Sequence, residues 1–448
     1  MPKIALVAMS GVRVKDRDLA EFGLTLPGFV ERSEVIASLP SLGLLTLASH
    51  VPKNWECSYI ECPGPIEEAH QQITQSTFDI VAISSLSARI FEAYKLSDQL
   101  RAKDYTVILG GLHVSALPQE AMQHADSVLQ GEGEHAIFQC LQDWENGRMS
   151  PFYSSLAEPA LAFDISGARV PRYDLLDIRN YNRLTLQTTR GCPLDCSFCA
   201  ASKTISTFKK KPIDQIKKEL DAIHQIWPTA FIELADDNTF IDKRWSLELV
   251  NALSETPFKW FTEADISIAD SPELLKLLAG SGCVQILIGF ESVNGLSLQN
   301  IDRSNWKSKR FDRYRESILR IQSYGISVNG CFILGHDSDD PGVFEETLNF
   351  VESSQLSEVQ ITLLTPFPNT RLYQQLKEEN RLFKEVYWDE CTLFDLTFEP
   401  KRMSANTLRS GFHSLMKELY NPAATRSRKR AFATMRHSRR DLEHPKSQ

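Results

Sequence analysis

Apolar and polar positions alternate in blocks along residues 1–150. Short apolar runs that end in small or polar residues are typical of buried parallel strands, and amphipathic stretches between them indicate helices. The expected strands are 4–9, 57–61, 79–86, 106–111 and 127–130, and the expected helices are 42–50, 65–76, 89–101 and 118–124. This order predicts an α/β fold: a doubly wound, Rossmann-like parallel sheet of about five strands with helices on both faces. Sheets of this kind bind ligands at the carboxyl ends of their strands.

A second alternation of strands and helices extends over residues 184–375. The expected strands are 184–187, 231–234, 260–263, 284–290, 328–334 and 359–364, and the expected helices are 213–226, 245–253, 272–280, 311–324 and 344–352. Residues 151–183 carry scattered Pro, Gly, Ser and aromatic residues, so we expect a connector that packs against its neighbours. Residues 376–448 are expected to form a small helical C-terminal cap and a basic tail.

Charge is distributed unevenly along the 448 residues, whose net charge is −9. From Arg426 to the end, eight Lys and Arg residues stand against two Asp and Glu, which leaves 41 basic and 56 acidic residues in the preceding 425. An acidic body argues against a large nucleic-acid interface. The tail is most simply a solvated or partly helical terminus, and contact with an anionic partner or a membrane surface is the alternative.

The chain shows no apolar run of about 20 residues, as a membrane span requires, and residues 1–7 read as a strand rather than a signal peptide. We therefore expect the protein in the cytoplasm, where a reducing environment keeps thiols available.

Three cysteines lie close together just after the first strand of the second alternation. Cys192, Cys196 and Cys199 have the spacing C-x3-C-x2-C. Three thiolates can hold three irons of a cubane cluster and leave the fourth iron open to a small-molecule ligand. A structural zinc site would need a fourth ligand close by, and disulfides do not suit an odd number of cysteines without a secretory signal. The other six cysteines show no tight spacing and are expected to be core residues: Cys57, Cys62, Cys140, Cys283, Cys331 and Cys391.

This loop, with Phe198 just before its last cysteine, resembles the signature of the radical S-adenosylmethionine (SAM) superfamily. The resemblance implies a 4Fe-4S cluster that binds SAM and cleaves it reductively to a 5'-deoxyadenosyl radical. It also implies that the six strand–helix units form a partial (β/α)6 TIM-type barrel, and that an electron donor such as flavodoxin or ferredoxin is needed.

The same resemblance assigns SAM-binding roles to residues at the strand ends. These residues are Phe198, Asp236, Asp237, Glu291, Gly330 and Gly335. Glu291 is the expected partner of the SAM ribose or amine. Gly330 and Gly335 flank the element that is expected to pack the adenine, and Phe198 is expected to lie against the adenine. For any single acid, a helix N-cap or a salt bridge is the alternative interpretation.

Small residues follow three strands of the first domain. They are Ser84, Ser85 and Leu86 after the third strand, Gly110, Gly111 and His113 after the fourth, and Gly131, Glu132 and Gly133 after the fifth. Glycine permits close approach of a large planar or phosphate-bearing ligand, although each glycine alone could simply serve a tight turn. Together, and placed before the cysteine loop, these elements resemble the cobalamin-binding domain of cobalamin-dependent radical SAM enzymes.

One element of that domain is missing here. A D-x-H-x-x-G motif, whose histidine ligates the lower face of cobalamin, should follow the first strand, but residues 8–13 read Ala-Met-Ser-Gly-Val-Arg and no histidine precedes His50. We therefore expect a lower face without a histidine ligand. His113 is a spare candidate, and a histidine that forms hydrogen bonds within a loop is the alternative.

The resemblance implies an enzyme that methylates an unactivated carbon of a small natural product, lipid or tetrapyrrole, with methylcobalamin as the methyl source. Oxidative cyclisation or rearrangement without methyl transfer is a second interpretation, and a non-catalytic binding or sensor module on the same folds is a third. No residue is assigned an acid–base role.

Overall fold

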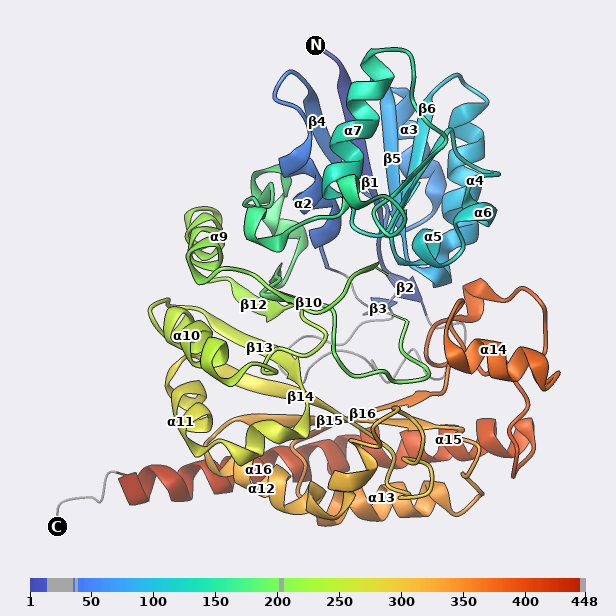
Figure 1. Cartoon of the computed structure of the whole chain (residues 1–448). Coiled ribbons are helices and arrows are strands. Elements are labelled where there is room, and N and C mark those ends of the chain that lie inside the picture. Colours follow the sequence, from blue (N-terminus) through green and yellow to red (C-terminus); the bar gives the residue numbers. More distant parts are fainter. Residues whose placement is uncertain (14–34, 37–38, 201–204, 444–448) are drawn as a thin grey trace.

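The computed structural model describes residues 1–13, 35–36, 39–200 and 205–443, so the last five residues of the expected basic tail lie outside it. Two α/β halves face each other in Figure 1: the N-terminal half, in blue and cyan, lies above the barrel half, in green to orange. The expected α/β fold is confirmed, with two parallel sheets of six strands each.

The first sheet is parallel throughout, in the order β4-β1-β5-β6-β7-β8. Its strands are β1 (Lys3–Met9), β4 (Glu56–Glu61), β5 (Ile80–Ser85), β6 (Thr106–Gly110), β7 (Ser127–Gln130) and β8 (Phe152–Ser154). Its helices are α2 (Leu42–His50), α3 (Ile66–Thr74), α4 (Ile90–Arg101), α5 (Leu112–Ala116), α6 (Pro118–Ala121) and α7 (Gly133–Glu145). A small antiparallel pair, β2 (Val12–Arg13) and β3 (Val35–Ile36), lies near its lower edge (Figure 1).

Successive residues of β1 point to opposite faces of this sheet, which explains the helices on both sides. Ala5 and Val7 join one apolar core with residues of α3 and α4, whereas Ile4 and Leu6 join another with residues of α2 and α7. The sheet is therefore doubly wound, as the sequence predicts.

The second sheet runs in chain order, β9-β12-β13-β14-β15-β16, and is parallel throughout. Its strands are β9 (Leu184–Leu186), β12 (Phe231–Leu234), β13 (Lys259–Ala264), β14 (Cys283–Glu291), β15 (Ser327–Leu334) and β16 (Glu358–Leu363). Its helices are α9 (Ile213–Ile226), α10 (Lys243–Ser254), α11 (Pro272–Gly280), α12 (Tyr314–Ser323), α13 (Val343–Ser353) and α14 (Arg371–Glu378). Because β9 and β16 are edge strands that do not pair with each other, the barrel is partial.

The C-terminal region connects the two halves. Trp388 donates a hydrogen bond from Nε1 to Glu120 Oε2 at 3.0 Å, and its ring belongs to the apolar core on the α3 and α4 face of the first sheet. Helix α15 (Ala405–Tyr420) is followed by α16 (Pro422–Glu443), which contacts α12 and β16. The basic tail is thus helical as far as Glu443, and Arg428 is buried with its guanidinium donating to the Leu419 carbonyl at 2.7 Å.

Three features were not expected from the sequence. The connector contributes β8, which extends the first sheet from about five strands to six, and helices α5 and α7 follow two of the glycine-containing turns. Strand β8 is only three residues long, too short for an alternating pattern to be visible.

None of the helices in the described ranges is both long and apolar enough to cross a bilayer.

Candidate functional site

The cysteine loop is closed at its base by two short antiparallel strands, β10 (Thr189–Arg190) and β11 (Lys209–Lys210). Gly191 follows β10 with φ of +74°, a left-handed conformation that favours glycine, and a Cβ there would lie 2.8 Å from the Thr207 carbonyl oxygen. Farther along, Ser197 donates its N–H to the Ile301 carbonyl at 2.7 Å and accepts from the Leu372 N–H at 3.0 Å. The loop is therefore anchored both at its base and across the barrel mouth.

The three cysteines of this loop are half-buried and influence one another electrostatically. Burial raises the pKa of Cys196 to about 12, with Glu291 and the other two cysteines adding to the effect and Lys307 opposing it. Burial also raises the pKa of Cys192. Thiols held protonated in this way become ligands only when a cation replaces the proton.

This donor set fits a cubane cluster better than a single ion. No group of three or more His, Cys, Asp and Glu side chains within the described ranges is gathered closely enough to hold one metal ion. In a cubane each thiolate binds a different iron, so the sulfurs need not converge on one point. The three thiols on one anchored loop, with Lys307 near Cys196, suit an anionic cluster with an open iron.

Asp236 lies at the end of β12 and anchors the strand that leads into the cysteine loop. Its buried carboxylate accepts the N–H groups of Thr188 and Thr189 at 2.6 and 2.8 Å, the Thr239 hydroxyl at 3.0 Å and the Thr188 hydroxyl. All four of these hydrogen bonds come from the protein, and they are accepted by the carboxylate that was expected to bind SAM. Asp236 is therefore a structural anchor in this geometry.

Its neighbour Asp237 faces an open cavity instead. Protein encloses the carboxylate on its other sides, and this burial together with the charge of Asp236 raises the pKa of Asp237, which the backbone N–H of Gly191 opposes. Of the two adjacent acids, Asp237 is the one available to a ligand.

Glu291 ends β14 with φ of +68°, at a register shift between β14 and β15. A left-handed backbone is costly for a residue other than glycine, by about 1–3 kcal/mol, and such strain concentrates at functional sites. The buried carboxylate accepts from Lys307 Nζ at 2.8 Å, and Lys307 also donates to the Gly289 carbonyl at 2.8 Å. Although burial alone lowers the pKa of Lys307, Glu291 raises it above its ordinary range.

The remaining residues expected near SAM lie against the helical layer or the loop. A Cβ on Gly330 would lie 2.9 Å from the Leu356 side chain, so Gly330 faces the helices rather than the barrel interior. Gly335 has φ of +104° and donates its N–H to Asp339 at 2.9 Å. Phe198 packs partly buried against the barrel core.

Glu263 is an acid of the barrel interior that the sequence reasoning missed. It lies on β13 with its side chain exposed to open space, and its carboxyl group has no hydrogen bond or ion pair within the described part of the chain. Although the carboxyl group is accessible, the protein around it displaces much of its water and raises its pKa to about 8, and Glu233, Asp237 and Glu291 add to the shift. The strand alternation, in which Phe261 and Glu263 share a face, is the only signal that could have placed it there.

A cavity of about 360 Å³ lies between the two halves. Ser84, Gly110, Gly111, Gly131, Glu132 and Gly133 from the first sheet line it, and Gln187, Arg190, Gly191, Ala235 and Asp237 from the barrel face them. A Cβ on Gly111 would lie 2.9 Å from Ser84 Oγ, and one on Gly133 would lie 2.9 Å from Leu47 Cδ2, so side chains here would fill the cradle. Leucines of α2 add apolar wall to these small residues, a mixture that suits the apolar face and amide-bearing rim of a corrin.

Three residues expected at cobalamin do not line this cavity: Ser85, Leu86 and His113. His113 is buried, with Nδ1 3.0 Å from Ser87 Oγ and Nε2 3.2 Å from Glu120 Oε1. Both ring nitrogens are thus engaged within the first domain. No histidine is found among the cavity-lining residues of the described ranges, and the lower face without a histidine ligand stays a prediction.

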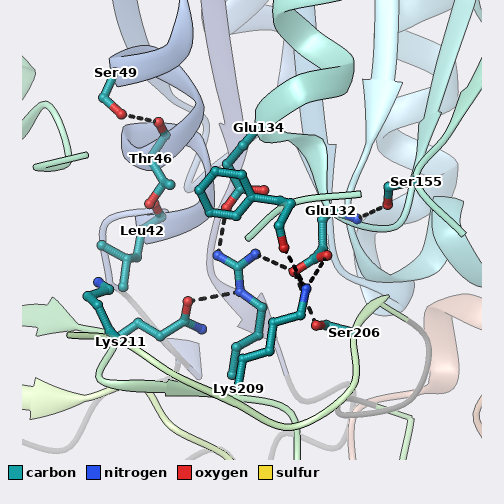
Figure 2. Close-up of polar contacts among 12 residues, drawn as sticks. Leu42, Thr46, Ser49, Glu132, Glu134, Ser155, Ser206, Lys209 and Lys211 are labelled. Carbon is teal, nitrogen blue, oxygen red and sulfur yellow. Dashed lines mark hydrogen bonds and ion pairs between the residues drawn. The ribbon is translucent and has the colours of Figure 1, made fainter. Parts of the chain in front are cut away.

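An ion cluster joins the two halves beside the cavity, and the sequence reasoning did not foresee it. Arg190 donates to Glu132 Oε1 at 2.9 Å and to Glu134 Oε1 at 2.6 Å. Lys209 Nζ lies 2.6 Å from Glu132 Oε2, and the Ser206 hydroxyl donates to the same carboxylate at 3.1 Å. Figure 2 shows Glu132, Ser206 and Lys209 turned toward one another.

Comparison with known proteins gives matches to three family models. They are the radical SAM superfamily over residues 186–351, the B12 binding domain over residues 33–141, and a domain of unknown function (DUF4070) over residues 370–448. The chain is 27% identical over 404 residues to bacteriochlorophyllide d C-12(1)-methyltransferase of Chlorobaculum tepidum, which covers 87% of this chain and 84% of that protein. It is 27% identical over 371 residues to hopanoid C-2 methylase of Rhodopseudomonas palustris, covering 81% of this chain and 68% of that protein.

Among solved structures, the fold is similar to that of TsrM, a radical S-adenosylmethionine methyltransferase from Kitasatospora setae with cobalamin and a 4Fe-4S cluster bound. The TM-score is 0.70 at 13% identity, and the match covers 98% of this chain and 100% of that one. At this identity the likeness concerns the fold alone.

Proposed function

Because the chain is an enzyme of the radical SAM superfamily that also carries a B12-binding domain, we propose that it methylates an unactivated carbon of a small molecule in a cobalamin-dependent reaction. The cofactors that these domains imply are a 4Fe-4S cluster, SAM and cobalamin. When bound, the cluster and SAM supply a carbon-centred radical that takes a hydrogen atom, and cobalamin supplies the methyl group.

One observation carries the proposal: the cavity between the halves is shared by the two cofactor regions. Gly110, Gly111 and Gly131 form one wall at the strand ends of the first sheet, and Gly191 and Asp237 form the other beside the cysteine loop. A corrin in this cavity would face the mouth of the barrel, so substrate carbon, SAM and cobalamin could meet without a large movement of the chain.

We assign each residue a positioning role that its surroundings support. Cys192, Cys196 and Cys199 hold the cluster, Glu291 with Lys307 lies next to Cys196, and Asp237 presents a carboxylate to the cavity. Phe231 and Phe261, whose ring centroids are 6.0 Å apart, supply an aromatic surface next to Glu263 on β13. This surface suits a largely apolar substrate with one polar group, and we propose a lipid, a tetrapyrrole or another small natural product.

The experiment is an anaerobic reconstitution with iron, sulfide, hydroxocobalamin and SAM, with dithionite or reduced flavodoxin as electron donor. Its substrate would come from an untargeted comparison of metabolites with and without the protein. Methyl transfer predicts equal amounts of 5'-deoxyadenosine and S-adenosylhomocysteine, that is, two SAM consumed per product. Deoxyadenosine without S-adenosylhomocysteine would refute methyl transfer and favour cyclisation or rearrangement.

Cobalamin binding is tested separately, because it does not depend on the substrate. Protein incubated with hydroxocobalamin should keep the visible absorption spectrum of the cofactor after desalting. The electron paramagnetic resonance spectrum of the reduced Co(II) form should lack the nitrogen splitting that a histidine ligand produces. Loss of the spectrum on desalting would contradict the proposal while leaving SAM cleavage to be measured independently.

A further inference from the structure

The two strands at the base of the cysteine loop carry like charges on directly opposite residues. Arg190 of β10 pairs with Lys209 of β11. Like charges at opposite positions of an antiparallel pair repel and destabilise it. The base of the loop therefore needs counter-charges, and the loop itself supplies none that contact both cations in the described ranges.

The counter-charges come from the first domain, more than fifty residues earlier in the chain. Glu132 contacts both cations, and Glu134 contacts Arg190, so two acids neutralise two bases. The side chains of Glu132 and Glu134 are only 6% and 4% exposed, and that of Arg190 is 16% exposed. Charged hydrogen bonds this well shielded from water are stronger than surface ion pairs, and losing one partner leaves a buried charge.

The same turn is held rigidly on its own side. Gly131 has φ of +82°, and Glu132 donates its N–H to Ser155 Oγ at 2.6 Å directly before α7 begins. Lys209 also donates to the Phe163 carbonyl of the connector at 2.7 Å. The ion cluster thus ties two segments, the turn before α7 and the connector, to the loop base formed by β10 and β11.

This ion cluster lies between the two cofactor regions. Glu132 and Arg190 line the cavity, Arg190 is two residues before Cys192, and Lys209 does not line the cavity. Any displacement of the turn that carries Glu132 must therefore move or break the base of the cysteine loop.

We propose that Arg190 and Lys209 are positioning residues that couple the corrin cavity to the cysteine loop, so that filling either site stabilises the other. This inference rests on the proposed function, since it requires that both cofactors bind. Coupling of this kind is reciprocal: the factor by which the cluster tightens cobalamin binding equals the factor by which cobalamin tightens the cluster.

The test compares Lys209→Gln with a matched control, Lys210→Gln. The two lysines are adjacent on β11, but Lys210 points away to an exposed pair with Asp242. Because Lys209 does not line the cavity, its substitution leaves the cavity wall unchanged. The dissociation constant of hydroxocobalamin is measured by equilibrium dialysis on full-length protein with and without its reconstituted cluster.

In the wild type and in Lys210→Gln, the cluster should tighten hydroxocobalamin binding by about 5- to 10-fold, at the lower end of typical coupling between sites. In Lys209→Gln this ratio should fall to within about twofold of one. In parallel, hydroxocobalamin should slow the release of cluster iron to the chelator ferrozine in the wild type, but not in Lys209→Gln.

A wild-type ratio of one, or an unchanged ratio in Lys209→Gln, overturns the coupling. If the wild type binds no hydroxocobalamin in either state, the proposed function fails as well, and the two failures are thereby told apart. Should Lys209→Gln fail to fold by circular dichroism, Arg190→Lys replaces it. This variant keeps the positive charge but lacks the planar guanidinium group that bonds both glutamates, so an intermediate ratio is expected.

Discussion

Gly191 offers the sharpest test of how the cysteine loop is built, because alanine there meets two separate obstacles. Its φ of +74° is disfavoured for any residue with a Cβ, at about 1–2 kcal/mol. The new Cβ would also lie 2.8 Å from the Thr207 carbonyl oxygen and 3.1 Å from the Phe208 nitrogen, both backbone atoms on the opposite side of the loop base. Backbone atoms cannot rotate away as a side chain can, so the loop base must open.

The energetic cost of opening the loop base, added to the backbone strain, gives roughly 2–4 kcal/mol of local destabilisation. Since each 1.4 kcal/mol is about a factor of ten, the loop should leave its cluster-binding position at least about tenfold more often. We expect Gly191→Ala to release cluster iron to ferrozine at least about ten times faster than the wild type, while the melting temperature of the whole chain changes little, because the loop lies outside both sheets.

Two control variants show whether faster iron release is specific to alanine at Gly191. Gly147→Ala places a Cβ at φ of +65° with nothing within 4 Å, so it carries strain without a collision, and Gly167→Ala has neither. Both should release iron at the wild-type rate, because neither residue belongs to the cysteine loop or to the two strands at its base. Wild-type release from Gly191→Ala, or equal acceleration by Gly147→Ala, would refute this account of the loop.

Three further predictions concern charged residues of the barrel. Asp236→Asn replaces an acceptor that receives four hydrogen bonds and should lower stability by about 2–3 kcal/mol, seen as a lower melting temperature, whereas Asp237→Asn should not. Glu263→Gln should stabilise the protein more at pH 8.5 than at pH 5.5, by a few degrees in melting temperature. The reason is that a pKa raised to about 8 makes the folded state hold a proton that the unfolded chain releases above about pH 4.5. The resulting cost in folding free energy grows as the pH rises to 8, and glutamine does not carry it. An equal gain at both pH values would contradict this reasoning. Lys307→Met should destabilise by about 3–5 kcal/mol because it leaves Glu291 buried without its cation, and adding Glu291→Gln should restore much of the loss; additive losses in a urea titration would argue against the pair.

Much of the fold could be predicted because apolar runs coincide with strands. Each strand expected in the two alternations is present within a residue or two, since buried parallel strands need continuous apolar sequence. The loop of Cys192, Cys196 and Cys199 was equally visible, because its ligand spacing is local. Strand β8 was missed since three residues carry no period.

What the sequence concealed are contacts between distant segments. Nothing local indicates that Glu132 meets Arg190, 58 residues later, or Lys209, 77 residues later, because like-sign and opposite-sign charges occur throughout the chain. The roles of neighbours were also ambiguous: Asp236 and Asp237 are adjacent and chemically equal, and only the folded geometry turns one inward and the other toward the cavity.

The division of the cavity between two walls has a consequence for the order in which the protein is assembled. The first wall consists of residues between 42 and 137, and the second of residues between 187 and 237. At about 5–20 residues per second, the ribosome completes the first wall roughly 5–20 s before the second. A cofactor that touches both walls can be enclosed only after that interval, so a fault in making the barrel would leave the cavity open even where every residue of the first domain is intact.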